Sequence, residues 1–140
     1  MSRRIIKLIF GIASAALWII ALFLPAYSDG TPGVMCLLFG WTYLFGGSTF
    51  AFFAWFANIP WIVGMFFFFA GKRKGVLLAS VFLSGAATLF TPGAFTVSEV
   101  MQNEGGTAVP VTASTAVFVW IASFVLLLSG CIINYNRAKE

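Results

Sequence analysis

The chain has no histidine, two cysteines and four acidic residues among its 140 residues, and only 9% of them are charged. A soluble globular domain usually carries about 25% charged residues, so this composition excludes that class. The usual nitrogen ligand of metals is missing, and Cys36 and Cys131 do not form a metal-ligand or redox spacing. We therefore expect no metal site, no redox site and no cofactor.

Ionisable side chains are also missing from the middle of the long apolar stretches. The interiors of the long apolar stretches contain no Asp, Glu, Lys or Arg, although such groups mark proton relays and ion-coupled transport. The chain also shows no nucleophile paired with a base and no phosphate-binding loop. An enzyme is therefore the least supported class, and a proton-coupled antiporter is disfavoured.

Most of the chain is apolar, with 61% hydrophobic residues. Four apolar stretches stand out, at residues 5–24, 50–70, 75–91 and 111–133. Each is interpreted as a membrane-spanning helix, which needs roughly 20 mainly apolar residues, and the third is the shortest. The sequence thus predicts an all-α integral membrane protein, with residues 1–140 forming a single membrane domain built as a four-helix bundle.

The first stretch has an alternative interpretation as a signal peptide. Arg3, Arg4 and Lys7 would form its basic start, and the segment Leu24-Pro25-Ala26 loosely resembles a cleavage site. The apolar run that follows Lys7 is longer than the roughly 7–15 residues of an ordinary signal-peptide core. This length favours a spanning helix.

The positive charges are distributed on one side of the predicted topology. With four spans, all eight basic residues fall on one face, and these are Arg3, Arg4, Lys7, Lys72, Arg73, Lys74, Arg137 and Lys139. The positive-inside rule then places both termini and the turn at 71–74 in the cytoplasm, and the loops at 25–49 and 92–110 outside. We expect the protein to lie in a bacterial cytoplasmic (inner) membrane.

The two external loops are predicted to contain short elements. Residues 34–45 are apolar but rise only about 18 Å as a helix, too little to cross a bilayer. We expect a short interfacial or re-entrant element there that packs against the bundle as a cap. In the second loop, Thr96 and Glu99 have the spacing of a capping box, which predicts a short external helix.

Asn58 is the most informative polar residue, because it lies near the middle of the second span, two residues before Pro60. An amide without a partner is costly in hydrocarbon. Pro60 lacks a backbone donor, so it should kink the helix and free the carbonyl of Phe56. We expect Asn58 to point into the bundle and to bond a Ser or Thr hydroxyl or that carbonyl.

A midplane polar layer is a further possibility, because each span carries one small polar residue near its middle: Ser14, Asn58, Ser84 and Ser123. These residues have two interpretations. They either hold the helices together, as small polar residues do in membranes, or they form a site for a solute. The sequence leaves both open and favours the first.

The function predicted from these features is non-catalytic. We expect a small multi-pass protein that acts by protein–protein contact in the bilayer, as an accessory subunit or an immunity-type protein. Its partners would be the lipid bilayer and another membrane protein or further copies of itself, with no nucleic acid. The alternative is a small channel or carrier for a neutral or weakly polar solute, built around Asn58.

Overall fold

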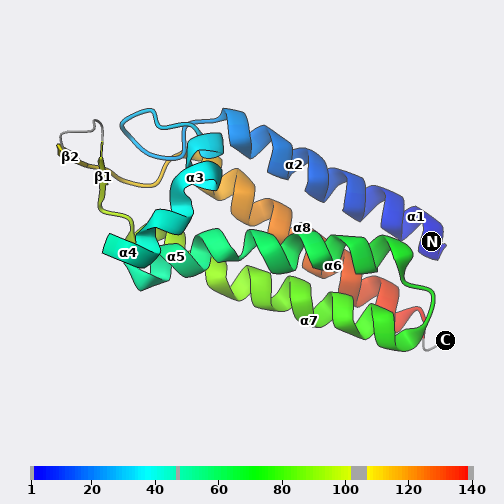
Figure 1. Ribbon diagram of the computed structural model, residues 1–140. Coiled ribbons are helices and arrows are strands. Elements are labelled where there is room, and N and C mark those ends of the chain that lie inside the picture. Colours follow the sequence, from blue (N-terminus) through cyan, green and yellow to red (C-terminus); the bar gives the residue numbers. More distant parts are fainter. Residues whose placement is uncertain (1, 47, 102–106, 139–140) are drawn as a thin grey trace.

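The computed structural model describes residues 2–46, 48–101 and 107–138, and it shows an elongated bundle of helices (Figure 1). Four helical segments are long and apolar enough to cross a membrane, and they are Arg3–Phe23, Thr49–Ala70, Lys74–Thr96 and Thr115–Asn136. Large apolar side chains point outward along them; Phe23, Phe82 and Leu89 are 70–79% exposed. The expected mainly helical architecture with four candidate spans is confirmed.

The spans are built from shorter elements. The first contains α1 (Arg3–Ile6), the π-helical η1 (Lys7–Gly11) and α2 (Ile12–Phe23). The second contains α5 (Thr49–Phe56) and α6 (Asn58–Ala70). The third contains α7 (Lys74–Phe90) and the 3-10 helix η3 (Thr91–Thr96), and the fourth is α8 (Thr115–Asn136).

The fourth helix does not have the bounds expected from apolarity. It covers Thr115–Asn136 instead of 111–133. The residues before it are extended, because the Val111 N–H donates to the Ser98 carbonyl and the Ser114 N–H donates to the Ala26 carbonyl, both at 2.8 Å. These backbone hydrogen bonds hold the segment against neighbouring loops. Hydropathy alone does not reveal such bonds, so it placed the start of the helix too early.

Both chain ends and the turn between α6 and α7 lie at the same end of the bundle, called the basic end here (Figure 1). The described basic residues belong to it, and they are Arg3, Arg4, Lys7, Lys72, Arg73, Lys74 and Arg137, while Lys139 lies outside the described residues. The opposite end, with α3 and the two strands, is called the loop end.

Two of the basic residues also connect helices at this end. The Lys7 ammonium donates to the carbonyls of Phe69 and Gly71, both at 2.8 Å, where α6 ends. A cation at this position complements the partial negative charge of a helix C-terminus. Arg3 Nε donates to Asn134 Oδ1 at 3.0 Å. The first span is thereby linked to both α6 and α8.

The first loop contains the short apolar element expected there, as α3 (Gly33–Phe39), η2 (Gly40–Thr42) and α4 (Tyr43–Gly46), together called the cap. It packs against the bundle through two features. The indole of Trp55 donates to the Leu37 carbonyl at 2.7 Å. Gly40 is buried, and a Cβ atom there would lie 2.5 Å from the Trp55 ring.

The second loop contradicts the predicted external helix. The 3-10 helix η3 ends at Thr96, and strands β1 (Glu99–Met101) and β2 (Ala108–Pro110) then pair antiparallel. The Thr96 hydroxyl donates back to the Gly93 carbonyl at 2.7 Å, so it ends one helix and does not start another. The described part of the chain is therefore mainly helical, consistent with the predicted all-α class, with one short two-stranded sheet in this loop.

The packing of the interior differs between the two ends. Near the basic end the buried cluster contains large side chains such as Trp61, Phe68, Phe124 and Leu127. The cluster at the loop end is dominated by alanines, including Ala51, Ala54, Ala94 and Ala116. Small side chains between helices fill less space, and the alanines of this cluster also line the cavity described below.

Candidate functional site

Asn58 is positioned by an interruption in the second span. The structure ends α5 at Phe56 and begins α6 at Asn58, with Ala57 as a turn between them. Pro60 has no N–H to donate to the Phe56 carbonyl, and helical bonding resumes where the Trp61 N–H donates to the Ala57 carbonyl at 3.1 Å. Asn58 thus begins a new helix inside the bundle, where its side chain is 8% exposed.

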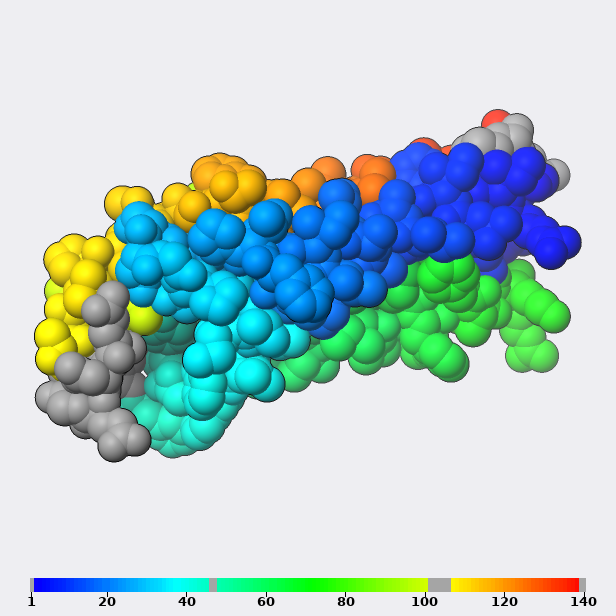
Figure 2. Space-filling model, turned by 90° about the horizontal axis from the view of Figure 1, so that it is seen from above, coloured from blue at the N-terminus to red at the C-terminus, as the bar shows by residue number. Residues whose placement is uncertain are grey.

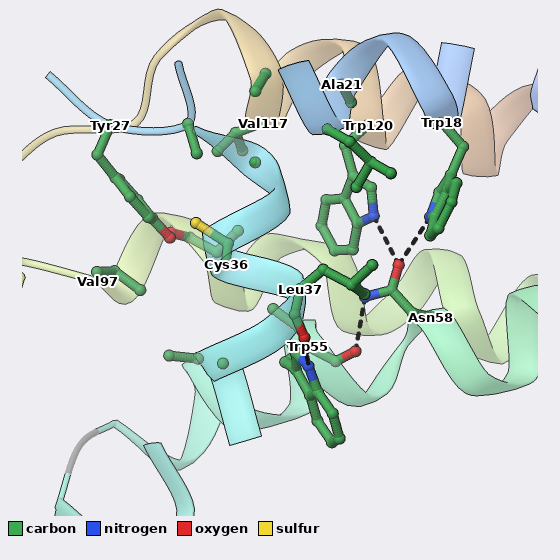
Figure 3. A pocket seen from close by; sticks show the side chains of 18 of the residues that line it. Trp18, Ala21, Tyr27, Cys36, Leu37, Trp55, Asn58, Val97, Val117 and Trp120 are labelled. Atoms are coloured by element: carbon green, nitrogen blue, oxygen red, sulfur yellow. Dashed lines mark hydrogen bonds between the residues drawn. The ribbon is translucent and has the colours of Figure 1, made fainter. Parts of the chain in front are cut away.

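The side chain of Asn58 points inward, but its partners are not the ones expected. Its Oδ1 accepts from the indole N–H of Trp18 at 2.9 Å and from that of Trp120 at 3.0 Å. Its Nδ2 donates to the Trp55 carbonyl at 2.8 Å. Figure 3 shows both indoles converging on this one oxygen. The partners are therefore tryptophans and a neighbouring carbonyl, and not a hydroxyl or the Phe56 carbonyl.

The three serines of the predicted midplane layer are fully buried but form no hydrogen bond with Asn58. Ser14 donates to the Ser123 carbonyl at 2.6 Å and so joins α2 to α8. Ser123 donates to the Trp120 carbonyl at 2.6 Å, and Ser84 to the Ser80 carbonyl at 2.7 Å, each within its own helix. The structure thus brings Ser14 and Ser123 together.

A cavity of about 80 Å³ lies beside Asn58, between the cap and the spans. By comparison, roughly 10–15 Å³ is enough to hold one water molecule. The side chains around it are uncharged, and they include six alanines, two glycines and the rings of Trp18, Tyr27, Tyr43, Trp55 and Trp120. The cavity is mainly apolar, with Asn58 among its few polar groups.

Aromatic rings are stacked in the bundle between Asn58 and the basic end. Trp61 and Phe124 follow Asn58 and Trp120 by about one helical turn in that direction. Trp61 stacks on Trp18 with ring centroids 5.4 Å apart and on Phe124 at 5.6 Å. The Trp61 indole N–H is buried without a partner. These rings, called the aromatic floor here, pack below the cavity toward the basic end, and of the three Trp18 also lines it.

A wider cleft of about 990 Å³ adjoins the cavity at the loop end. The two spaces share Tyr27, Cys36, Gly40, Tyr43 and Val97, which are called the neck here. Figure 3 shows Tyr27 and Cys36 across the cavity from Asn58. In Figure 2 the surface is hollowed at this end, between the cyan cap segment and the yellow segment of the second loop. The cavity therefore borders the cleft at the loop end through the neck, and Asn58 lines it away from the neck.

The neck carries titratable groups that stay neutral near physiological pH. Burial raises the pKa of the Cys36 thiol to about 11, and the nearby carboxylate of Asp29 adds to this shift. Burial likewise raises the pKa values of Tyr27 and Tyr43, with a smaller contribution from Asp29. Cys36 is thus not a thiolate nucleophile. Both cysteines are free.

Sequence reasoning missed the residues that hold Asn58. Trp18 and Trp120 come from the first and last spans, and no spacing along the chain relates them to Asn58. One signal was present, because an indole inside a membrane requires a partner for its N–H and Asn58 is the one amide in the middle of a predicted span. Matching interior donors to interior acceptors would have suggested the pairing.

The chain was compared with family models, with curated proteins and with solved structures, and nothing matched. In the described part of the chain, no group of three or more Cys, Asp or Glu side chains could hold a metal ion. The geometry of the pocket is therefore the basis for assigning a function.

Proposed function

We propose that the chain is a non-catalytic, multi-pass membrane protein that binds a small, mainly apolar molecule in the pocket beside Asn58. The observation that carries this proposal is the cavity of about 80 Å³, lined by small side chains and aromatic rings and bordered by the cleft at the loop end. Ligand sites are typically concave, mostly apolar and equipped with a few placed polar groups. The pocket has these properties.

The alternative of a channel or carrier receives less support from the same geometry. A channel needs a path past Asn58, and the stacked rings of Trp18, Trp61 and Phe124 fill the space beneath it. A carrier would need a second conformation in which this floor opens. Catalysis is not favoured either, because the pocket lining offers no carboxylate, imidazole or thiolate beside Asn58.

We further propose that four helices span the bilayer with both termini and the turn at 71–74 in the cytoplasm. The support is the gathering of basic side chains at one end, since positively charged residues are retained on the cytoplasmic side. The pocket then opens on the external side of a bacterial inner membrane. A cysteine introduced at Lys74 should react with a membrane-impermeant reagent only from the inside, and labelling from the outside would reverse the orientation.

The pocket proposal is tested by filling the cavity. Val117, on α8, is buried and lines the cavity, whereas Val125, on the same helix, is 47% exposed and points away from the interior. With the protein in lipid nanodiscs, n-butanol should give a saturation-transfer signal in the NMR spectrum. Val117→Phe should abolish this signal, because the larger ring occupies the cavity.

Val125→Phe is the matched control, and it should leave the signal unchanged. Both variants are first checked by thermal unfolding, so that loss of binding is not loss of fold. Equal signals from the wild type and from folded Val117→Phe would show that butanol is merely dissolved in the lipid, and they would contradict the proposal.

A second candidate function is protein–protein contact, as an accessory subunit or an immunity-type protein. One observation favours it: the cap exposes large apolar side chains, although it is too short to be a span, and these are Met35, Leu38, Phe39, Trp41, Leu44 and Phe45. Exposed apolar patches mark membrane or protein contacts. If butanol does not bind and mild detergent yields a defined complex with another polypeptide or with further copies, this candidate replaces the first.

A further inference from the structure

We propose that the ligand of this pocket is a small organic cation, with its charged group at the neck and its apolar part in the inner cavity. The inference rests on the proposed function, since it names the chemistry of the molecule that the same pocket would bind. It depends on the charge around the mouth, on the side chains of the neck and on the composition of the inner cavity.

The charge at the mouth of the pocket is negative. Asp29 and Glu99 line the cleft, and no lysine or arginine occurs among the lining residues that the structure describes. The described basic residues lie at the other end of the bundle, beyond the aromatic floor. Clefts lined by charges of one sign concentrate ligands of the opposite sign. The mouth therefore attracts a cation and repels an anion.

The Asp29 carboxylate is held in place close to the neck. Its Oδ1 accepts from the Thr31 N–H at 3.1 Å and its Oδ2 accepts from the Thr31 hydroxyl at 2.5 Å. Its negative charge is felt by Tyr27, Cys36 and Tyr43, where it disfavours further negative charge. The same potential stabilises a positive group at the neck.

The neck and the inner cavity suit different parts of the ligand. Tyr27 and Tyr43 provide aromatic rings at the neck, and the faces of such rings attract ammonium groups. Deeper in the cavity the side chains are uncharged, and most of them are alanines and indoles. A desolvated charge would find no counter-ion there. The charged end of the ligand thus belongs at the neck and its hydrocarbon end beside Trp18 and Trp120.

The experiment compares three molecules with the same four-carbon chain and different charge: n-butylammonium, n-butanol and butyrate. The protein is placed in nanodiscs of phosphatidylcholine, which has no net charge, and binding is titrated by saturation-transfer NMR. Butylammonium should bind about fivefold more tightly than butanol, and butyrate should bind least. Equal affinity for butanol and butylammonium would overturn the cation proposal and leave the pocket in place. No binding of any of the three would reject both.

A charge-neutral substitution identifies the residue responsible. Asp29→Asn keeps an oxygen that can accept from Thr31 but removes the negative charge. It should lower the affinity for butylammonium by up to about fivefold, with the rings of Tyr27 and Tyr43 still in place, and leave butanol binding unchanged. Lys72→Gln, at the basic end, is the control and should alter neither affinity. A folded Asp29→Asn variant that binds butylammonium as the wild type does would contradict the proposal.

Discussion

Replacing Asn58 with leucine should lower the free energy of unfolding by about 2–4 kcal/mol. The substitution removes the acceptor shared by the half-buried indoles of Trp18 and Trp120 and leaves two N–H groups inside the bundle without this partner. It also removes the bond to the Trp55 carbonyl. Because the indoles line the cavity, their displacement should also abolish n-butanol binding. Thermal or denaturant unfolding in detergent measures the first effect, and saturation-transfer NMR measures the second.

A second buried asparagine provides the matched control. Asn134 is fully buried, accepts one hydrogen bond from Arg3 and has an Nδ2 without a partner. Asn134→Leu removes one bond but also removes an unsatisfied donor, so it should cost less than about 1 kcal/mol. Equal losses from the two substitutions would show that Asn58 is an ordinary buried amide. The loss at Asn58 should shrink when Trp18 and Trp120 are both phenylalanine, because no indole N–H is then orphaned.

The spans were predictable because bilayer thickness and the absence of water inside it act on each segment separately. A long apolar run has few alternatives to a helix at that depth, since every backbone group must be bonded within the segment. The cap was predictable for a related reason, because residues 34–45 are apolar but too few to cross. The interrupted helix at Pro60 and the inward orientation of Asn58 were also predictable, because a proline lacks a backbone donor and an amide in the bilayer needs a partner.

The second loop and the partners of Asn58 were not predictable in the same way. Thr96 and Glu99 match a capping box, yet Thr96 hydrogen-bonds backward to Gly93 and the next residues form a strand. Whether these residues begin a helix or a strand depends on where η3 ends, and η3 belongs to the third span. The convergence of Trp18 and Trp120 on Asn58 depends on the rotation of three helices about their axes. Such relations arise from packing between segments distant in sequence.

The position of the cap depends on close approach between backbones. Gly33 begins α3, and its N–H donates to the Leu24 carbonyl at 3.0 Å. A Cβ atom on this residue would lie 2.1 Å from the Ala21 carbonyl oxygen, which belongs to the rigid backbone of α2. Ordinary contact begins near 3.4 Å. Any side chain at this position therefore forces α3 away from α2, and both elements line the cavity.

Gly33→Ala should consequently destabilise the protein by about 1–3 kcal/mol, the usual cost of overpacking, and loosen the cap over the pocket. The rate at which a methanethiosulfonate reagent modifies Cys36 should rise, while Cys131, which is fully buried, should stay unreactive. Gly75→Ala is the control: it adds the same methyl group within α7, where nothing lies within 4 Å, so it should raise stability by about 0.5–1 kcal/mol. A methyl group cannot share the space of a fixed carbonyl, so Gly33→Ala must move α3 if the contact exists. Unchanged melting and unchanged Cys36 reactivity in this variant would therefore show that the cap is not held by this contact.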